Sequence, residues 1–147
     1  KAYEELMPSK ARGVAQKKLD LAREICQALT VHATIEEEIF YPALKGKIDS
    51  DLLKEAYVEH DGAKMLINEI VEGGPDEEFY NAKVMVLKEQ IEHHVKEEEK
   101  EHDNMFQQAR AADVDLNALG QQMLARKKEL KMQADAGNLP LAEMTTM

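Results

Sequence analysis

The sequence predicts an all-α protein folded as an up-down antiparallel helical bundle, and three observations support this prediction. Of the 147 residues, 33% are charged and only 5% are aromatic, with no Trp, which suits helices better than a β-sandwich or barrel. Most glycines and prolines stand at a few breaks between long segments. Within each segment, apolar residues recur at spacings of three and four, and no segment shows the alternation of a strand. The length suits one domain with a core of its own.

The breaks also predict where the helices lie. After a short first piece, most segments begin at an Asp or Ser that can cap a helix, and end at glycine or proline. The predicted helices span residues 14–44, 51–72, 76–112 and 116–134. The last of them is expected either to pack outside the bundle or to complete it. Residues 137–147 are expected to form an irregular tail.

Charge and cysteine content exclude several functions and predict a compartment. With 29 acidic against 19 basic side chains, the net charge of −10 disfavours nucleic acid and an anionic membrane surface as partners. No stretch approaches the roughly 20 apolar residues of a membrane span, and the N-terminal residues do not resemble a signal peptide. The single cysteine, Cys26, lies in an apolar helical run. We therefore expect a buried thiol, no intrachain disulfide and a cytoplasmic protein.

Each of the first three predicted helices has an apolar stripe that should face the core, and each of these stripes contains histidine. The apolar members of these stripes are Leu21, Ile25, Leu29, Leu53, Ala56, Ala63, Ile67, Ile70, Val84, Leu87 and Ile91. The polar residues on the same stripes are His32, Glu36, His60, His94 and Glu98. These five residues form the candidate site.

A metal ion would explain why carboxylates stand on core-facing stripes. An ionised carboxylate buried without a partner costs several kcal/mol, and two that face each other also repel. Neutral imidazole and carboxylate are natural metal ligands, and a histidine four residues before a glutamate lies on the same helix face. The alternative is that the histidines are only hydrogen-bonded in the core of a metal-free helical interaction module. Position on the stripe carries the argument, because about one residue in five is acidic and the spacing alone is common.

Other residues near these stripes have weaker expectations. His93 is expected to be exposed or to hydrogen-bond a ligand from outside. Glu99 is the fallback for Glu98, and His102 could lie at the end of the site. Tyr41 is expected mainly to pack, although a tyrosine hydroxyl near a metal could hydrogen-bond a bound ligand.

Three motifs resemble a known family. Residues 32–44 have the sequence His-Ala-Thr-Ile-Glu-Glu-Glu-Ile-Phe-Tyr-Pro-Ala-Leu, which resembles the H-x-x-x-E-E…F-Y-P signature of the bacterial hemerythrin-like HHE cation-binding domain. Glu59 and His60 resemble its E-H motif, and residues 93–99 resemble its H-H-V-x-E-E-E motif. Residues 109–127 look like its C-terminal helix. The resemblance covers most of the chain and implies a domain at 1–136, followed by the tail at 137–147.

The resemblance implies a four-helix bundle with an additional C-terminal helix and a non-haem diiron centre. Carried over residue by residue, it makes His32, Glu36, His60, His94 and Glu98 the metal ligands, with Glu36 and Glu98 bridging two iron ions. Other divalent metals could also bind such a site. The implied function is to bind or sense dioxygen or a related small oxidant, peroxide or nitric oxide. A diiron enzyme that decomposes peroxide or handles nitric oxide is the alternative within the family, and a contact between copies through the last helix is also open.

The sequence departs from the family pattern in two places. The family's opening D-H motif has no counterpart, and residues 1–5 look like the stretch just after it. The missing histidine is therefore expected about one helical turn upstream of Lys1, with the first helix truncated there, or else the site is incomplete. Residues 101–104 also stand as an insertion before Phe106 relative to the family pattern, and Gln107 stands where proline is usual, which makes His102 a further candidate.

Overall fold

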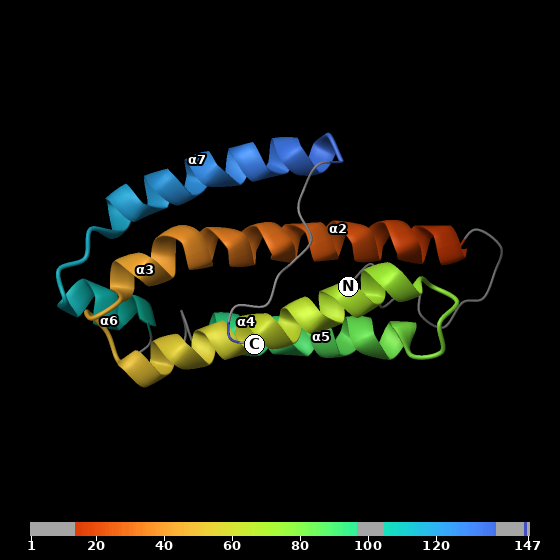
Figure 1. The fold of residues 1–147 in the computed structure, drawn as a ribbon, viewed down its shortest axis with the longest axis horizontal. Helices are drawn as coiled ribbons and strands as arrows, with labels where there is room; N and C mark the ends of the chain where they lie inside the picture. The colour runs from red at the N-terminus through yellow and green to blue at the C-terminus, as the bar shows by residue number, and fades with distance from the viewer. Residues whose placement is uncertain (1–13, 97–104, 138–145, 147) are drawn as a thin grey trace.

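The computed structural model describes residues 14–96, 105–137 and 146. Three long helices lie side by side, α2 (Val14–Ile35), α4 (Ser50–Gly73) and α5 (Tyr80–Val95) (Figure 1). A fourth long helix, α7 (Leu116–Asp135), packs along α2, and the short α6 (Met105–Ala111) precedes it. The described residues contain no strand. The predicted all-α bundle with an additional C-terminal helix is confirmed.

The predicted helix at 14–44 forms as one helical path with a change of geometry inside it. α2 continues into a π-helical turn, η1 (Glu36–Phe40), and then into α3 (Tyr41–Leu44). In η1 the backbone amide of Tyr41 donates to the carbonyl oxygen of Glu36, five residues back instead of four. The path ends before Gly46, whose φ of +80° is a conformation that glycine adopts without strain.

Aspartate caps begin two of the helices as the sequence predicted. The carboxylate of Asp49 accepts a hydrogen bond from the amide of Asp51 at 2.9 Å, at the start of α4. The carboxylate of Asp115 accepts one from the amide of Ala118 at 3.0 Å, at the start of α7. Each cap satisfies a backbone donor that the first helical turn leaves free.

The expected cap at Asp76 is wrong, because α5 begins four residues later, at Tyr80. The preceding turn is held instead by Glu77, whose carboxylate accepts a hydrogen bond from the amide of Phe79 at 2.9 Å. Of the predicted helix at 76–112, the structure describes α5 and α6. Residues 97–104 lie outside the described part of the chain.

Two apolar clusters fill the bundle at different positions along the helices. The hairpin cluster, near the α4–α5 connection, consists of Ala22, Cys26, Ala63, Ile67, Ile70, Tyr80, Val84 and Leu87. The α6 cluster consists of Phe40, Tyr41, Leu44, Leu53, Ala56, Met105, Ala109 and Leu119. A smaller group, Val31, Ile35 and Leu130, lies where α7 packs on α2. Both faces of α2 are therefore covered.

The predicted stripes agree with this packing on α4 and need adjustment on α2. Every apolar stripe member of α4 is buried, as are Val84 and Leu87 on α5. Where α2 meets the hairpin cluster, the buried residues are Ala22 and Cys26, whereas the larger side chains at 21, 25 and 29 are only half-buried. The small side chains allow α2 to approach its neighbours closely, and the larger ones flank the contact. The predicted burial of Cys26 is confirmed.

None of the helices in the described part of the chain combines the length and the apolar character needed to cross a membrane.

Candidate metal centre

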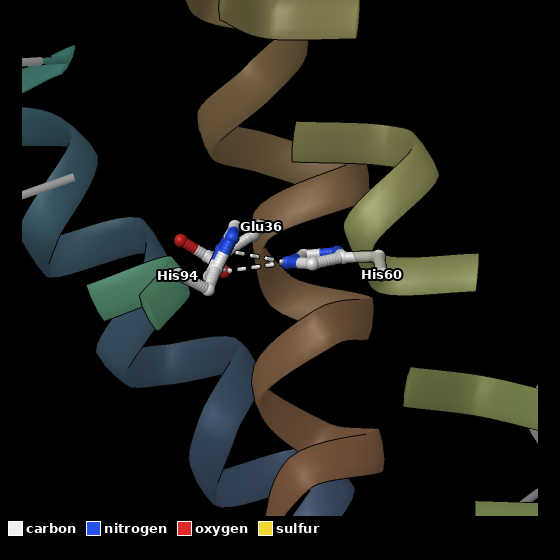
Figure 2. A group of neighbouring side chains, drawn as sticks. All are labelled: Glu36, His60 and His94. Atoms are coloured by element: carbon white, nitrogen blue, oxygen red, sulfur yellow. Dashed lines mark hydrogen bonds and ion pairs between the residues drawn. The ribbon is translucent and has the colours of Figure 1, made fainter. Parts of the chain in front are cut away.

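Three buried polar side chains from three different helices meet in the middle of the bundle (Figure 2). Glu36 comes from η1, His60 from α4 and His94 from α5, and each residue is 2–3% exposed. Glu36 Oε1 lies 3.1 Å from His60 Nε2 and 3.5 Å from His94 Nε2, and the two Nε2 atoms are 3.0 Å apart. On the path from α2 to α3 and on α4 this polar layer lies between the hairpin cluster and the α6 cluster, and on α5 His94 follows the hairpin-cluster residues Val84 and Leu87. Apolar layers on both sides keep water away from it.

The hydroxyl of Tyr41 is a fourth polar atom at the same point. It lies 3.1 Å from His60 Nε2, 3.0 Å from His94 Nε2 and 3.4 Å from Glu36 Oε1. The residue is fully buried. Its position depends on η1, because residues five apart in an α-helix point about 140° away from each other. The wider π turn brings Glu36 and Tyr41 to the same face.

A carboxylate holds the outer nitrogen of each buried histidine. His60 Nδ1 lies 3.0 Å from Glu37 Oε2, and His94 Nδ1 lies 2.9 Å from Glu59 Oε2. A carboxylate only accepts hydrogen bonds, so each Nδ1 carries a proton and donates it. In the neutral ring the lone pair is then on Nε2, which faces the centre of the site. Histidines that bind metals are oriented in this way by their outer hydrogen bonds.

Charged groups around the site leave an excess of negative charge. Lys64 Nζ lies 2.8 Å from a Glu37 oxygen and 3.6 Å from Asp61 Oδ1. Asp61 is fully buried and also accepts hydrogen bonds from the backbone amide and the hydroxyl of Thr146. In the part of the chain that the structure describes, carboxylates of Glu36, Glu37 and Glu59 contact the two buried histidines, and Lys64 balances part of the charge of Glu37 and Asp61. A cation at the centre would compensate this charge.

When both imidazole rings are neutral, the site has too few protons to make a hydrogen bond at each of its short contacts. Glu36 Oε1 and the two Nε2 atoms offer lone pairs, His32 Nε2 can donate to Glu36 Oε1 at 2.8 Å, and the hydroxyl of Tyr41 brings one proton. The Tyr41 proton satisfies one contact among four atoms that all lie within 3.5 Å of one another, and the lone pairs of the two Nε2 atoms face each other at 3.0 Å. Either a histidine takes up a further proton or a cation binds between the lone pairs. Two imidazole nitrogens, a carboxylate and a phenol are a donor set that fits a transition-metal ion.

The pKa shifts of the site follow from these contacts. Burial alone would raise the pKa of the Glu36 carboxyl, but hydrogen bonds from His32, His60 and His94 hold it well below its usual range. Burial would lower the pKa of His60, yet its hydrogen bonds to Glu36 and Glu37 raise it above the ordinary 6.5. The metal-free site therefore keeps Glu36 ionised and attracts a proton to His60, and a metal ion competes with that proton for Nε2.

The structure brings three of the five predicted ligands together. Glu36, His60 and His94 form the buried group. The side chain of His32 is 49% exposed, at the edge of the site, with Nε2 2.8 Å from Glu36 Oε1. Glu98 lies outside the described residues, as do Glu99 and His102. His93 is exposed, one of the two positions that the sequence left open.

Of the four residues that complete the site, sequence reasoning gave Glu37 only as a possible near-ligand on a mainly solvated face, and it did not predict the contacts of the other three. Tyr41 was expected mainly to pack, and helical spacing gave no reason to place its hydroxyl beside Glu36. Glu37 and Glu59 stand next to predicted ligands in the chain, but only the packing of neighbouring helices shows which histidine each one contacts. Lys64 stands one turn after His60, and a lysine on a buried stripe indicates an acidic partner nearby, which the sequence could have predicted.

The fold and the site together define a helical bundle with a buried carboxylate and histidine cluster of the kind that binds metals. The sequence model of the hemerythrin HHE cation-binding domain matches residues 1–106, and the chain belongs to this family. The match confirms the predicted resemblance and ends within α6, so that α7 lies beyond it. No curated protein and no solved structure shows significant similarity to the chain. The predicted domain boundary at residue 136 stays a prediction.

Proposed function

We propose that the chain is a non-haem diiron protein that binds or senses dioxygen or a related small oxidant, peroxide or nitric oxide. Its membership of a cation-binding family supports the proposal. The observation that carries it is the convergence of Glu36 Oε1 with two Nε2 atoms whose rings are oriented by outer carboxylates. The proposed ligands are His32, Glu36, His60, His94 and Glu98, with Glu36 and Glu98 as bridges.

The protein's own residues would prepare the site for iron. Glu37 and Glu59 hold the Nδ1 protons of the histidines and keep each ring turned toward the centre. The apolar clusters above and below exclude water, which strengthens the attraction between the ligands and a cation. Bound iron would supply electrons and an open position for a small oxidant.

The proposed ligand is therefore a small neutral molecule or peroxide, and the proposed location is the cytoplasm. The buried Cys26 fits a reducing compartment, because burial raises the pKa of its thiol to about 11 and keeps it protonated. A net charge of −10 gives no support for nucleic acid as a partner.

Iron content and optical spectra of the full chain test this proposal. We expect two iron ions per chain after anaerobic loading with Fe²⁺, and a change in the visible spectrum when dioxygen is admitted. Glu36→Ala should lose both properties. Glu38→Ala is the matched control, because Glu38 belongs to the same π turn but is exposed and pairs with Arg126 at 2.8 Å.

Three results would count against the proposal in different ways. A chain without stoichiometric iron, together with a more stable His60→Leu variant, would favour the metal-free interaction module. Sustained turnover of peroxide or nitric oxide that Glu36→Ala abolishes would favour the enzyme. Iron binding that survives Glu36→Ala would show that the metal lies elsewhere.

A further inference from the structure

The hydroxyl of Tyr41 occupies a position suited to a metal ligand. With Glu36 Oε1 and the Nε2 atoms of His60 and His94, it forms a group of four atoms in which every pair lies 3.0–3.5 Å apart. Four atoms with six nearly equal separations are the corners of a tetrahedron. The geometry points to Tyr41 as the fourth ligand of a four-coordinate metal site formed with Glu36, His60 and His94.

The size of the tetrahedron matches metal–ligand bonds. When the edges have these lengths, the centre lies about 2 Å from each corner, which is the usual bond length from a divalent metal to a histidine nitrogen or a carboxylate oxygen. An ion at the centre would thus reach all four atoms without movement of the helices. Four-coordinate tetrahedral geometry is the preferred arrangement of Zn²⁺ and is accessible to Co²⁺ and Fe²⁺.

Packing around the ring holds the hydroxyl in this position. Tyr41 belongs to the α6 cluster, and its ring lies at 5.8 Å from that of Phe40 and at 5.1 Å from that of Tyr57, centre to centre. The backbone of η1 fixes the side of the helix from which the ring projects. A ligand held by packing in this way loses little conformational freedom when the metal binds.

Metal binding at this site would ionise the phenol. The O–H bond of Tyr41 breaks, a bond from the same oxygen to the metal forms, and the proton passes to solvent. The metal keeps its oxidation state in this step. The negative charge on the phenolate oxygen is then compensated by the cation, as it is for a metal-bound thiolate or hydroxide.

The position of a second ion rests on the proposed function. Four donors from the protein fill a four-coordinate site, so a small oxidant would need a second ion with a position still open. Glu36 Oε2 takes no part in the six contacts, and the half-exposed side chain of His32 lies on the outer side of Glu36, with Nε2 2.8 Å from Oε1. The second ion is therefore expected on the His32 side of Glu36, which makes the two positions of the centre unequal.

Tyr41→Phe tests the assignment, because it removes only the hydroxyl and keeps the buried ring. Tyr57→Phe is the matched control, since it makes the same change on the ring that packs against Tyr41. The full chain is titrated anaerobically with Co²⁺, whose visible absorption is strong in four-coordinate sites and weak in six-coordinate ones. We expect strong absorption in the wild type and in Tyr57→Phe. In Tyr41→Phe we expect a changed, weaker spectrum and an affinity lower by on the order of 100-fold.

An unchanged Co²⁺ spectrum and affinity in Tyr41→Phe would overturn the inference. If that variant does not fold, resonance Raman spectra of the wild type loaded with Fe³⁺ decide instead, because a bound phenolate gives tyrosine vibrations that are enhanced in its charge-transfer band. Absence of these vibrations would also overturn it. If Tyr41→Phe loses Co²⁺ binding and the wild type shows no oxygen chemistry, the proposed function is wrong and the Tyr41 site stands. If the wild type and Tyr41→Phe load iron and react with dioxygen equally well, the proposed function stands and the assignment of Tyr41 is wrong.

Discussion

The helical path from α2 through η1 to α3 packs with α4 and α5 in two different ways along its length. In the hairpin cluster they meet through apolar side chains, from Ala22 and Cys26 on α2 to Leu87 on α5. Further along the bundle they meet through a carboxylate, two imidazoles and a phenol. Each of these polar side chains occupies a position that an apolar residue would fill in an ordinary bundle.

The two layers differ in what they need from outside the protein. Apolar side chains in the hairpin cluster gain free energy from burial alone. The polar layer has buried lone pairs that face one another, and its stability depends on a proton or a cation between them. One layer therefore stabilises the fold unconditionally, and the other stabilises it only when something is bound. Four predictions separate these two roles.

Substitutions in the two layers should have opposite consequences. Leu87→Ala should lower the free energy of unfolding by about 2–5 kcal/mol, because it leaves a cavity in the hairpin cluster, and should barely change metal affinity. Glu36→Gln should lower metal affinity by more than about 100-fold, since it removes the central carboxylate. The metal-free Glu36→Gln protein should remain folded, because the amide can donate to the Nε2 lone pairs. Urea denaturation measures the free energy of unfolding, and chelator competition measures metal affinity. The comparison is wrong if the two variants change each of these quantities to the same extent.

Metal should stabilise the protein through the polar layer. At a free metal concentration 100 times the dissociation constant, the free energy of unfolding should rise by about 2.7 kcal/mol, which corresponds to a Tm increase on the order of 10 °C. Thermal denaturation followed by circular dichroism, with and without Zn²⁺, measures the shift. Leu87→Ala should show the same increase from a lower starting Tm. A similar increase in Glu36→Gln would place the metal outside this layer.

The outer carboxylates should contribute to metal affinity without touching the metal. Glu37→Gln and Glu59→Gln keep a side chain of the same size but replace the charged acceptor of each Nδ1 proton. Each variant should lower affinity by about 10–100-fold. Glu38→Gln changes an exposed carboxylate in the same turn and should have no effect. If Glu37→Gln and Glu59→Gln bind metal as well as Glu38→Gln does, the histidines are oriented by packing alone.

Metal affinity and metal-free stability should respond to pH in opposite directions. The pKa of His60 is raised in the folded protein, so its contribution to metal-free stability is fully present below pH 6.5 and is lost as the pH rises through the folded pKa. Metal needs the neutral ring, so affinity should increase over the same range, by up to about tenfold per pH unit for each proton released. Zn²⁺ titrations and urea denaturation across this range measure both trends. Parallel trends would show that His60 is not the group that exchanges a proton for metal.

The sequence predicted the helices, the buried stripe of α4 and three residues of the buried cluster, and the reasons are simple. Apolar spacing is a property of each helix alone, and Glu36, His60 and His94 interrupt it visibly. The stripe of α2 was less clear, because the small residues Ala22 and Cys26 make its close contacts and the larger side chains at 21, 25 and 29 lie half-buried beside them.

The rest of the site depends on relations between helices that no single helix contains. The partners of the two Nδ1 atoms follow from the rotation and height of α4 against η1 and α5. The role of Tyr41 follows from a turn that ordinary helical periodicity does not describe. The apolar residues around it predicted packing, and Tyr41 does pack, but its hydroxyl also enters the polar layer.

The π turn at Glu36–Phe40 makes the site sensitive to the length of the chain as well as to its residues, because the turn holds one residue more than an α-helix along the same path. An α-helix with the same number of residues would turn everything beyond it by about 100°, and the hydroxyl of Tyr41 would leave the carboxylate of Glu36. An in-frame deletion of the Glu38 codon removes the extra residue, so that a regular α-helix would place the tyrosine four residues after Glu36, on the same face. An in-frame insertion at the same place adds a second extra residue and would separate the two groups while every donor residue is still encoded. In this bundle, the site tolerates the loss of one codon where it does not tolerate the gain of one.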